Sequence, residues 1–382
     1  MRILIAAGGT GGHVYPALAV ARSLRERAPD ADFRWLGGRR GLESTIVPAE
    51  GYRYDSLVLR SLRTVDASVH LVLDPARLGA SIPQATAFLV RWRPDVIFTT
   101  GGYVAVPVVS AAATLRVPSL MWEGNMIPGR SVRATARLAR ALAVSFAETC
   151  SQLPGQCYVT GTPIRSFAGR DRASGRAALG IEGAAPVLFV FGGSQAVRRL
   201  NRAVADALPR LVERSFVVHM TGEAAYADAL RRREALPAAL RTRYKPYAFL
   251  RAEMTDALLA ADLLVGRAGS STLAEASALG LPMVVVPYPH ASAHQAANAR
   301  ALADAGAARI VPDADFDADA LVNAAALLDD QSALDAMRAA AREFGRPGAA
   351  AAVAELVLAL AERTPLPSVS SIERMSRAGK EL

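Results

Sequence analysis

Residues 266–298 constrain the fold of this chain more than any other stretch of its sequence. Residues 262–265 predict a strand that runs into a glycine turn, and residues 272–279 predict a short helix. A Gly-Leu-Pro sequence ends that helix, because glycine accepts a left-handed cap and proline cannot continue a helix. The apolar run at 283–287 has the length and β-branching of a buried parallel strand. This order predicts a βαβ unit whose turn lies at the carboxyl end of the first strand, where open α/β sheets bind ligands.

The start of the predicted helix has the chemistry of a nucleotide-binding site. Gly269, Ser270 and Ser271 would lie at its N-terminus, where N–H groups without an intrahelical partner and the helix dipole attract phosphate. Glu275 follows one turn later, and a carboxylate there can accept hydrogen bonds from both hydroxyls of a ribose. The spacing also permits another interpretation, since Thr272 and Glu275 match the T-x-x-E pattern of a capping box. On this stretch alone, both interpretations remain open.

Three polar residues follow the second strand of this unit: His294, Gln295 and Asn298. Their side chains suit the hydroxyl groups of a sugar. A polar cap on the next helix explains the same residues equally well.

The N-terminus has the same order of elements. Residues 2–7 predict a buried strand, residues 8–13 a glycine-rich turn, and residues 15–27 a helix. The spacing is neither G-x-G-x-x-G nor a P-loop, but the backbone amides of such a turn can bind a diphosphate. His13 would lie at the helix start, where the positive end of the dipole favours the neutral imidazole that a general base needs. The alternative is a histidine that only caps the helix.

Strand, glycine turn and helix recur at 187–211, so the second half of the chain repeats the first. Together with 382 residues, this repeat predicts an α/β protein with two Rossmann-like, doubly wound parallel-sheet domains that face each other across a cleft. We expect an N-terminal domain at 1–163, a C-terminal domain at 164–345, and a C-terminal helix and tail at 346–382 that pack back on the N-terminal domain. The tail from residue 364 is expected to be frayed or loosely packed.

Residues 75–92 predict a helix with apolar residues at helical spacing and arginines at its ends. An ordinary core-facing helix explains this pattern. The alternative is a membrane-surface patch around Ile82, Phe88 and Trp92, with the arginines on lipid headgroups.

The composition excludes several classes of protein. With 52% hydrophobic and 21% charged residues, the chain is globular, and its net charge of +9 suits an acidic ligand or an anionic surface. Aromatic residues are sparse, which argues against a nucleic-acid partner. Cys150 and Cys157 match neither a metal-ligand pattern nor a disulfide framework, so we expect a reducing compartment. Neither a signal peptide nor a membrane-spanning stretch is expected.

Six motifs occur in one order and spacing: GGTGGHVYPALAVA, TTGGYVAVP, WEGNMIPG, GTPIR, FVFGGSQAVRRLN and RAGSSTLAEASALGLPMVVVPYPHASAHQAANA. From residue 2 to about residue 360, the chain resembles glycosyltransferase family 28. Bacterial enzymes of this family have a GT-B fold and move N-acetylglucosamine from UDP-GlcNAc onto undecaprenyl-diphospho-muramoyl-pentapeptide. The resemblance implies an inverting transfer to the C4 hydroxyl of the muramoyl sugar, with the lipid acceptor in the N-terminal half and the nucleotide sugar in the C-terminal half.

The resemblance also implies roles for individual residues. His13 is the first candidate for the general base and Glu123 the second. No cofactor is expected, and no D-x-D motif appears where a nucleotide-bound metal would lie. The residues implied in substrate binding are Thr10, Gly11 and Gly12 near the donor and its diphosphate, Asn125, Arg165 and Ser194 at the donor, Leu250 at the uracil, Ser270, Ser271, Thr272, Leu273, Ala274 and Glu275 at phosphate and ribose, and Gln295 at the sugar.

The implied partners are UDP-GlcNAc, the lipid-linked acceptor, an anionic membrane surface at the Ile82, Phe88 and Trp92 patch, and other cell-wall and division proteins. The implied location is peripheral, on the cytoplasmic face of the bacterial inner membrane. Three alternatives remain: a GT-B glycosyltransferase with another lipid or small-molecule acceptor, a nucleotide-sugar epimerase, and a non-catalytic protein that binds nucleotide sugars.

Overall fold

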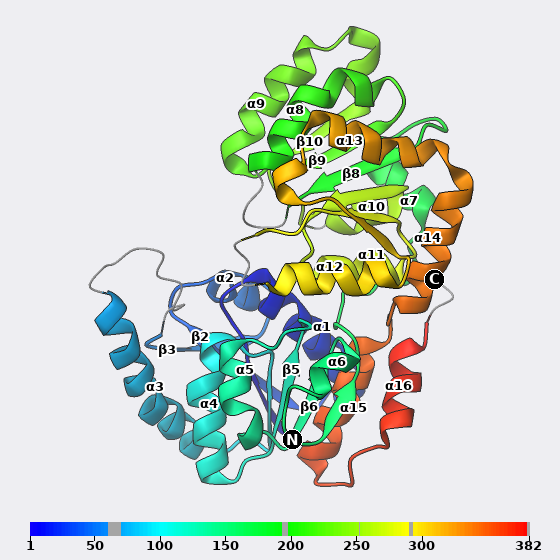
Figure 1. The fold of residues 1–382 in the computed structure, drawn as a ribbon. Coiled ribbons are helices and arrows are strands. Elements are labelled where there is room, and N and C mark those ends of the chain that lie inside the picture. Colours follow the sequence, from blue (N-terminus) through cyan, green and yellow to red (C-terminus); the bar gives the residue numbers. More distant parts are fainter. Residues whose placement is uncertain (60–69, 193–197, 252, 290–292, 380–382) are drawn as a thin grey trace. The chain divides into compact units, whose positions relative to one another are not determined.

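The computed structural model describes residues 1–59, 70–192, 198–251, 253–289 and 293–379, except for the side chains at 70–76. Contacts within the chain divide it into two compact units (Figure 1). The N-terminal unit comprises Met1–Arg165 and Arg346–Gly379, and the C-terminal unit comprises Ser166–Gly345.

The N-terminal unit is built on a parallel sheet with the strand order β3-β2-β1-β4-β5-β6-β7. The order reverses between β1 and β4, which creates a switch point at their carboxyl ends. Its strands are β1 (Arg2–Ala6), β2 (Asp32–Gly38), β3 (Arg53–Leu57), β4 (Val96–Thr99), β5 (Ser119–Glu123), β6 (Ala141–Val144) and β7 (Cys157–Val159). Its helices are α1 (Gly11–Arg27), α2 (Glu43–Ala49), α3 (His70–Trp92), α4 (Gly102–Leu115), α5 (Arg130–Thr135), α6 (Ala147–Cys150), α15 (Ala349–Glu362) and α16 (Val369–Arg377), with the 3₁₀ helix η1 (Ala136–Leu138).

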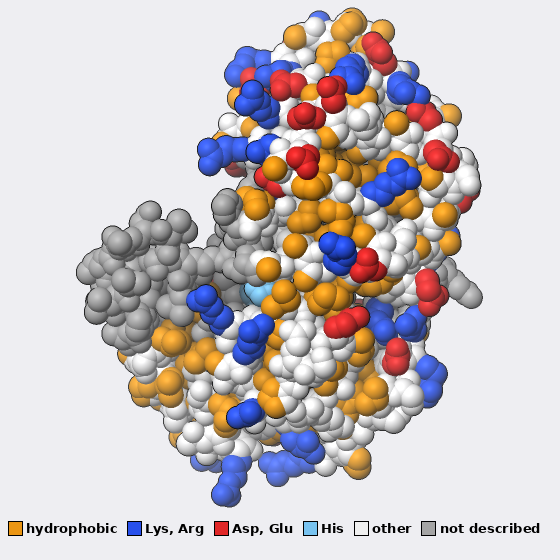
Figure 2. All heavy atoms as spheres, in the orientation of Figure 1, with side chains coloured by type: hydrophobic (Ala, Val, Ile, Leu, Met, Phe, Trp, Pro, Cys, Tyr) orange, Lys and Arg blue, Asp and Glu red, His pale blue; other side chains and the backbone are white. Residues whose placement is uncertain are grey.

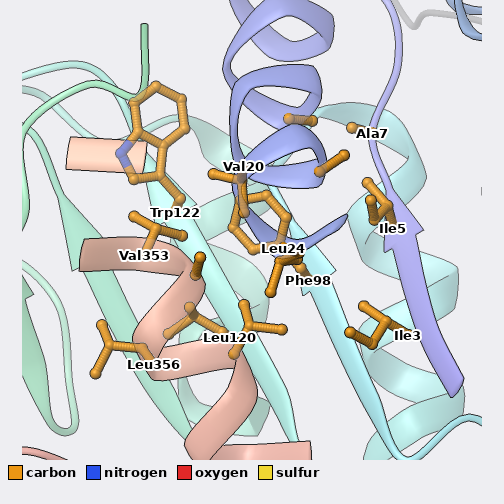
Figure 3. Close-up of a cluster of buried hydrophobic side chains, with 14 of the residues drawn as sticks. Ile3, Ile5, Ala7, Val20, Leu24, Phe98, Leu120, Trp122, Val353 and Leu356 are labelled. Atoms are coloured by element: carbon orange, nitrogen blue, oxygen red, sulfur yellow. The ribbon is translucent and has the colours of Figure 1, made fainter. Parts of the chain in front are cut away.

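Hydrophobic residues on both faces of this sheet are buried. Ile3 and Ile5 of β1 pack with α1 and α15, where Leu24 and Leu356 are fully buried (Figure 3). Leu4 and Ala6 of β1 point to the opposite face and pack with α3 and α4. Each fully buried aliphatic side chain contributes roughly 1.5–3 kcal/mol of transfer free energy. This packing holds the carboxyl ends of the strands, and the turns that follow them, in place.

Residues 364–379 pack on the N-terminal unit, so the expectation of a frayed or loosely packed tail from residue 364 is wrong for this described part. Helix α16 buries Ile372 in the same core as α15. The hydroxyl of Tyr158 donates to the carbonyl of Pro367 at 3.1 Å, and Arg346 donates to Ser376 Oγ at 2.9 Å. The amphipathic pattern of α16 explains the order, because its apolar face finds a partner in the N-terminal unit.

The C-terminal unit repeats the architecture with the strand order β10-β9-β8-β11-β12-β13, again in parallel. Its switch point lies between β8 and β11. Its strands are β8 (Val187–Phe191), β9 (Phe216–Met220), β10 (Tyr244–Tyr247), β11 (Leu263–Gly266), β12 (Met283–Val285) and β13 (Ala308–Ile310). Its helices are α7 (Arg172–Ala178), α8 (Arg198–Val212), α9 (Glu223–Ala235), α10 (Glu253–Ala260), α11 (Ser270–Ala278), α12 (His294–Asp304), α13 (Ala318–Ala325) and α14 (Gln331–Phe344), with the 3₁₀ helices η2 (Ala238–Arg243), η3 (Asp313–Asp315) and η4 (Ala326–Asp329).

The two cysteines depart from the sequence prediction. Cys150, at the end of α6, and Cys157, at the start of β7, form a disulfide with a Cα–Cα distance of 5.7 Å. The expectation that they form no disulfide is therefore wrong. A short loop returns the chain from α6 to the sheet, and this return brings the two side chains together.

Within the described residues, the stretch 331–362 is long and apolar enough to cross a membrane, and half of its apolar 18-residue segment is buried. It comprises α14 and α15, whose apolar side chains belong to the cores of two different units. Buried core helices pass the same test, so this stretch is weak evidence for a membrane span.

Candidate functional site

Two glycine turns meet at the switch point of the N-terminal unit. Residues 8–12 follow β1 and residues 101–103 follow β4, and these strands pair in register from Ile3↔Val96 to Ala6↔Thr99. A Cβ atom on Gly102 would lie 3.1 Å from the carbonyl oxygen of Gly8, and the φ angle of Gly102 is +71°. Glycine is required there, because a side chain would strain both the backbone and the contact.

His13 lies between these turns. Helix α1 begins at Gly11, earlier than the sequence predicts, so His13 is in its first turn. The imidazole Nδ1 is 2.7 Å from the carbonyl oxygen of Thr100, and the Thr100 hydroxyl donates to the carbonyl of His13 at 3.0 Å. A carbonyl only accepts, so Nδ1 must carry the hydrogen, and the neutral ring then has its lone pair on Nε2. This contact orients the ring toward the turn after β4 rather than as a cap on α1.

The residues before His13 form the start of α1. Thr10 is the N-cap residue, and its carbonyl accepts from the amides of His13 at 3.0 Å and Val14 at 3.2 Å. Gly11 and Gly12 are the first two helical residues, so their amides belong to the group that has no intrahelical acceptor. These amides are available to an anion at this helix end.

Glu123, the second candidate for the base, is buried at the end of β5. One carboxylate oxygen accepts from the Asn125 amide at 2.9 Å and from its side-chain Nδ2 at 3.0 Å. The other oxygen accepts from the amide of Gly129 at 2.7 Å. The carboxylate therefore organises the loop after β5 and fixes the position of Asn125 in it.

Arg165 belongs to the N-terminal unit, at the end of its first segment. Its guanidinium carbon lies 5.8 Å from the centre of the Tyr15 ring, within cation–π range. Tyr15 is the fifth residue of α1, so Arg165 adds a positive charge near the start of this helix.

Glu43 is a site residue that sequence reasoning missed. It is the first residue of α2 and is 0% exposed. Its carboxylate accepts from the Gly9 amide at 2.9 Å and from the Tyr103 hydroxyl at 2.6 Å. Burial, and secondly the hydrogen bond to Glu43, raise the pKa of Tyr103, so the phenol stays protonated and donates. In the sequence, the signal for such a role is an acidic residue close to the glycines at 37, 38 and 41.

In the C-terminal unit, α11 begins at Ser270 with Gly269 as its N-cap residue. Thr272 is therefore the third helical residue, and the interpretation of Thr272 and Glu275 as a capping box is wrong. Glu275 is 7% exposed and lies in the second turn. The amides of residues 270–272 have no intrahelical acceptor, as expected for a phosphate site. The buried Ser271 Oγ lacks a hydrogen-bond partner within the described part of the chain.

Leu273 and Ala274, the next two residues of α11, do not offer a phosphate the amides that residues 270–272 offer. Leu273 is buried, and its amide donates to the carbonyl of Gly269 at 3.0 Å, which closes the first turn of the helix. Ala274 follows it within α11 and is half-buried. The amides that can meet a phosphate are thus concentrated at residues 270–272.

Arg267, between β11 and α11, was also missed. Its buried guanidinium donates to Asp313 Oδ1 at 2.5 Å and to the carbonyl of Val286 at 3.0 Å. It lies 5.3 Å from the centre of the Tyr288 ring. The residue therefore ties the turn after β11 to the loop after β12 and to η3. Sequence alone did not distinguish it from a surface arginine.

The polar residues after β12 have different roles. The Tyr288 amide donates to Gln295 Oε1 at 2.9 Å, so the side-chain Nε2 of Gln295 is the group that can donate to a sugar. Asn298 is fully buried, and its side chain donates to the carbonyl of Ala268 at 3.4 Å. Asn298 therefore supports the turn before α11. His294 is the first residue of α12.

Leu250 and Ser194 are the two remaining residues with a predicted substrate contact. Leu250 follows β10 and is buried, and its amide lies 3.4 Å from the sulfur of Met220. Its carbonyl is therefore the backbone group that can accept from a nucleobase. Ser194 falls at 193–197, outside the described residues. Across the described ranges, no group of three or more His, Cys, Asp or Glu side chains is placed to hold a metal ion.

The structure corrects the predicted membrane patch on α3. Trp92 is 7% exposed, packs in the core with α4, and has its ring nitrogen 3.4 Å from Asp32. Phe88 is half-buried against the same core. Ile82 of the predicted patch is exposed, and so is Val90. Figure 2 shows hydrophobic side chains gathered over the described part of α3, with Lys and Arg side chains nearby. The inclusion of Trp92 in an exposed patch is therefore wrong.

A buried histidine outside these turns makes stability depend on pH. His219 of β9 is enclosed by the Tyr244 hydroxyl, 2.9 Å from Nδ1, and by Asn201 Oδ1, 3.0 Å from Nε2. Burial lowers its pKa from 6.5 to about 3. Since the unfolded chain binds the proton more readily, the contribution of His219 to stability is complete above pH 6.5 and is lost as the pH falls toward 3.

We expect this loss to reach about 2 kcal/mol at pH 5. Amide hydrogen exchange in β9, followed at pH 5 and pH 7.5, measures the change in the C-terminal unit. In His219→Gln the difference between the two pH values should shrink by that amount. An unchanged difference would show that another group is responsible.

Two doubly wound parallel sheets, each with candidate ligand-binding residues at its switch point, define a two-domain nucleotide-binding α/β protein. Residues 3–144 match the Glycosyltransferase family 28 N-terminal domain, and residues 187–353 match the Glycosyltransferase family 28 C-terminal domain. The chain belongs to glycosyltransferase family 28, as its sequence motifs suggest.

Similar proteins match along almost the whole chain. A protein of Moorella thermoacetica is 39% identical over 375 residues, which cover 95% of this chain and 100% of the relative. A protein of Desulforudis audaxviator is 38% identical over 372 residues, covering 94% and 99%. Both are named UDP-N-acetylglucosamine–N-acetylmuramyl-(pentapeptide) pyrophosphoryl-undecaprenol N-acetylglucosamine transferase. The crystal structure of Acinetobacter baumannii MurG has a TM-score of 0.72 and 27% identity, and covers 94% of this chain and 99% of that one.

Proposed function

We propose that this chain transfers N-acetylglucosamine from UDP-GlcNAc to the C4 hydroxyl of undecaprenyl-diphospho-N-acetylmuramoyl-pentapeptide, with inversion at the anomeric carbon. The observation that carries the proposal is the match to relatives named as N-acetylglucosamine transferases for this lipid. The match spans both units and their glycine turns at 38–39% identity. The product is a β-1,4-linked disaccharide on the lipid, and UDP is released.

The C-terminal unit provides the groups that bind the donor. The amides of residues 270–272 and the positive end of the α11 dipole meet the diphosphate, with the Ser271 hydroxyl beside them. Glu275 accepts from the two hydroxyls of the ribose, and Gln295 Nε2 donates to the sugar. The Leu250 carbonyl accepts from the uracil.

The N-terminal unit provides the base. The acceptor C4 oxygen attacks the anomeric carbon and transfers its proton to His13 Nε2. The bond from that carbon to the diphosphate oxygen breaks, and its electron pair leaves with UDP. Backside attack inverts the configuration. Charge on the departing diphosphate is stabilised by helix amides and by Arg165.

His13 is preferred to Glu123 as the base because of the contacts that each makes. The carbonyl of Thr100 fixes the His13 tautomer that has a lone pair on Nε2. Both oxygens of Glu123 accept hydrogen bonds within their own loop. Proton uptake by that carboxylate would disrupt the loop that presents Asn125.

We further propose that α3 contacts the membrane that contains the acceptor, on its cytoplasmic face. The exposed side of α3 presents Ile82, Ala87 and Val90, and Arg91 and Arg93 follow them. Apolar side chains can enter the interface while the arginines attract anionic headgroups. Cell-wall and division proteins are part of the same proposal as further partners.

Val90 on α3 and Val369 on α16 are equally suited to substitution, because their side chains are 52% and 49% exposed. Val369 therefore serves as the control position. We expect Val90→Asp combined with Ile82→Asp to weaken binding to anionic vesicles about tenfold or more, through lost insertion and added repulsion. Val369→Asp on α16 should bind as the wild type does. Cosedimentation with phosphatidylglycerol vesicles measures both. Unchanged binding of the double variant would place the contact elsewhere.

Three other functions predict different results in one assay with UDP-GlcNAc and candidate acceptors. A transferase for another lipid or small molecule releases UDP only with that acceptor. An epimerase converts UDP-GlcNAc without any acceptor. A sensor binds UDP-GlcNAc and leaves it intact.

A further inference from the structure

The Glu43 carboxylate is a buried group at the N-terminal switch point that the transfer step does not use. It accepts from three donors: the Gly9 amide at 2.9 Å, the Gly38 amide at 3.2 Å and the Tyr103 hydroxyl at 2.6 Å. These donors follow β1, end β2 and follow β4, respectively. Three hydrogen bonds compensate the carboxylate for the loss of water. One side chain therefore joins three strand ends.

The surrounding glycines leave room for this carboxylate and for Tyr103. A Cβ atom on Gly8 would lie 2.4 Å from Glu43 Oε1, and one on Gly37 would lie 2.9 Å from Glu43 Cγ. A Cβ atom on Gly38 would lie 2.3 Å from the Tyr103 hydroxyl oxygen. Close packing around the Glu43–Tyr103 pair therefore requires glycine at these positions, whether or not a ligand binds beside them.

The packing around Glu43 and Tyr103 extends to the imidazole of His13. A Cβ atom on Gly102 would lie 3.5 Å from His13 Cδ2 and 3.1 Å from the Gly8 carbonyl oxygen. Gly102 is therefore enclosed between the first glycine turn and the imidazole. Its neighbour Tyr103 and the turn residue Gly9 are both bonded to Glu43. A shift of either turn consequently moves the surface against which the imidazole packs.

We propose that Glu43 is a positioning residue for the transfer reaction: it aligns the turns at 8–12 and 101–103 and thereby holds His13 at reacting distance from the acceptor. This inference rests on the proposed function. Glu43 does not touch the reacting atoms. Its effect is geometric, and a misplacement of about 1 Å at a reacting group costs roughly 100-fold in rate.

The test is Glu43→Gln in the full chain, because glutamine keeps the shape but turns a donor toward groups that already donate. We expect kcat to fall about 10- to 100-fold, with the KM for UDP-GlcNAc within about twofold, since the proposed contacts to uracil and ribose belong to the C-terminal unit. Tyr103→Phe removes one donor and should give a smaller loss of kcat. Leu356→Ala is the matched control: it lowers the melting temperature through the core of the same unit, and kcat below that temperature should be unchanged.

A second readout does not require turnover. In the ¹⁵N-labelled chain, the ring signals of His13 are assigned by their loss in His13→Ala, and they should move in Glu43→Gln but not in Leu356→Ala. Unmoved His13 signals in Glu43→Gln, an effect on KM alone, or an equal loss of kcat in Leu356→Ala would each overturn the inference. If the wild type makes no disaccharide, the transfer assignment fails, while the His13 signals still report on Glu43.

Discussion

His13→Ala should lower the turnover of UDP-GlcNAc with the lipid-linked acceptor by about 10²- to 10⁴-fold, the usual contribution of a general base. The physical reason is the tautomer: the Thr100 carbonyl holds the hydrogen on Nδ1, so Nε2 can take the proton from the C4 hydroxyl. Single-turnover kinetics with the purified chain measure the chemical step directly. UDP-GlcNAc binding, followed by calorimetry, should change little.

His13→Asn is the control for this prediction, because its Nδ2 occupies the position of the imidazole Nδ1. Its amide can still donate to the Thr100 carbonyl, so it preserves the local contact but cannot accept a proton as a base. Both variants should therefore be slow. Normal turnover in either variant, with donor binding intact, would remove His13 from the mechanism and leave Glu123 as the candidate.

Glu275→Gln should raise the KM for UDP-GlcNAc about 10- to 100-fold and change kcat much less. Hydrogen bonds to a charged group contribute about 1.5–3 kcal/mol, and each 1.4 kcal/mol corresponds to a factor of ten. The ribose contact is the same in the ground state and the transition state, so its loss is expected in KM. Initial rates over a range of donor concentrations provide both constants.

A donor with a 2′-deoxyribose separates this role from a structural one. The wild type should lose affinity for the deoxy donor, and Glu275→Gln should lose little more, because the two changes remove the same hydrogen bond. Additive losses would mean that Glu275 does not contact that hydroxyl. A lower melting temperature with an unchanged KM would assign Glu275 to the stability of α11.

Much of the fold was predictable because parallel strands and glycine turns have strong local patterns. The strands expected at 2–7, 262–265 and 283–287 are β1, β11 and β12, and each observed bound lies within two residues of the expected one. Strand β3 was missed, since Arg53–Leu57 is a partly exposed edge strand with mixed polar residues and lacks a buried apolar run. The start of α1 was placed too late, because glycine has a low helix propensity and Gly11 and Gly12 are the first two residues of this helix.

The site was less predictable because its contacts come from distant segments. Glu43 and Tyr103 are 60 residues apart, and only the folded sheet brings the carboxylate to the hydroxyl. The helical spacing of Trp92 is the same for a buried face and an exposed face, so sequence could not assign the side. The capping interpretation of Thr272 depended on a helix start that was two residues late.

The most direct test of the transferase assignment is incubation of the purified chain with UDP-GlcNAc and undecaprenyl-diphospho-N-acetylmuramoyl-pentapeptide, followed by mass spectrometry and NMR of the lipid. The account predicts a β-1,4-linked disaccharide on the lipid and one UDP for each sugar transferred. An unchanged lipid, with UDP-GlcNAc either left intact or consumed without the acceptor, would contradict it.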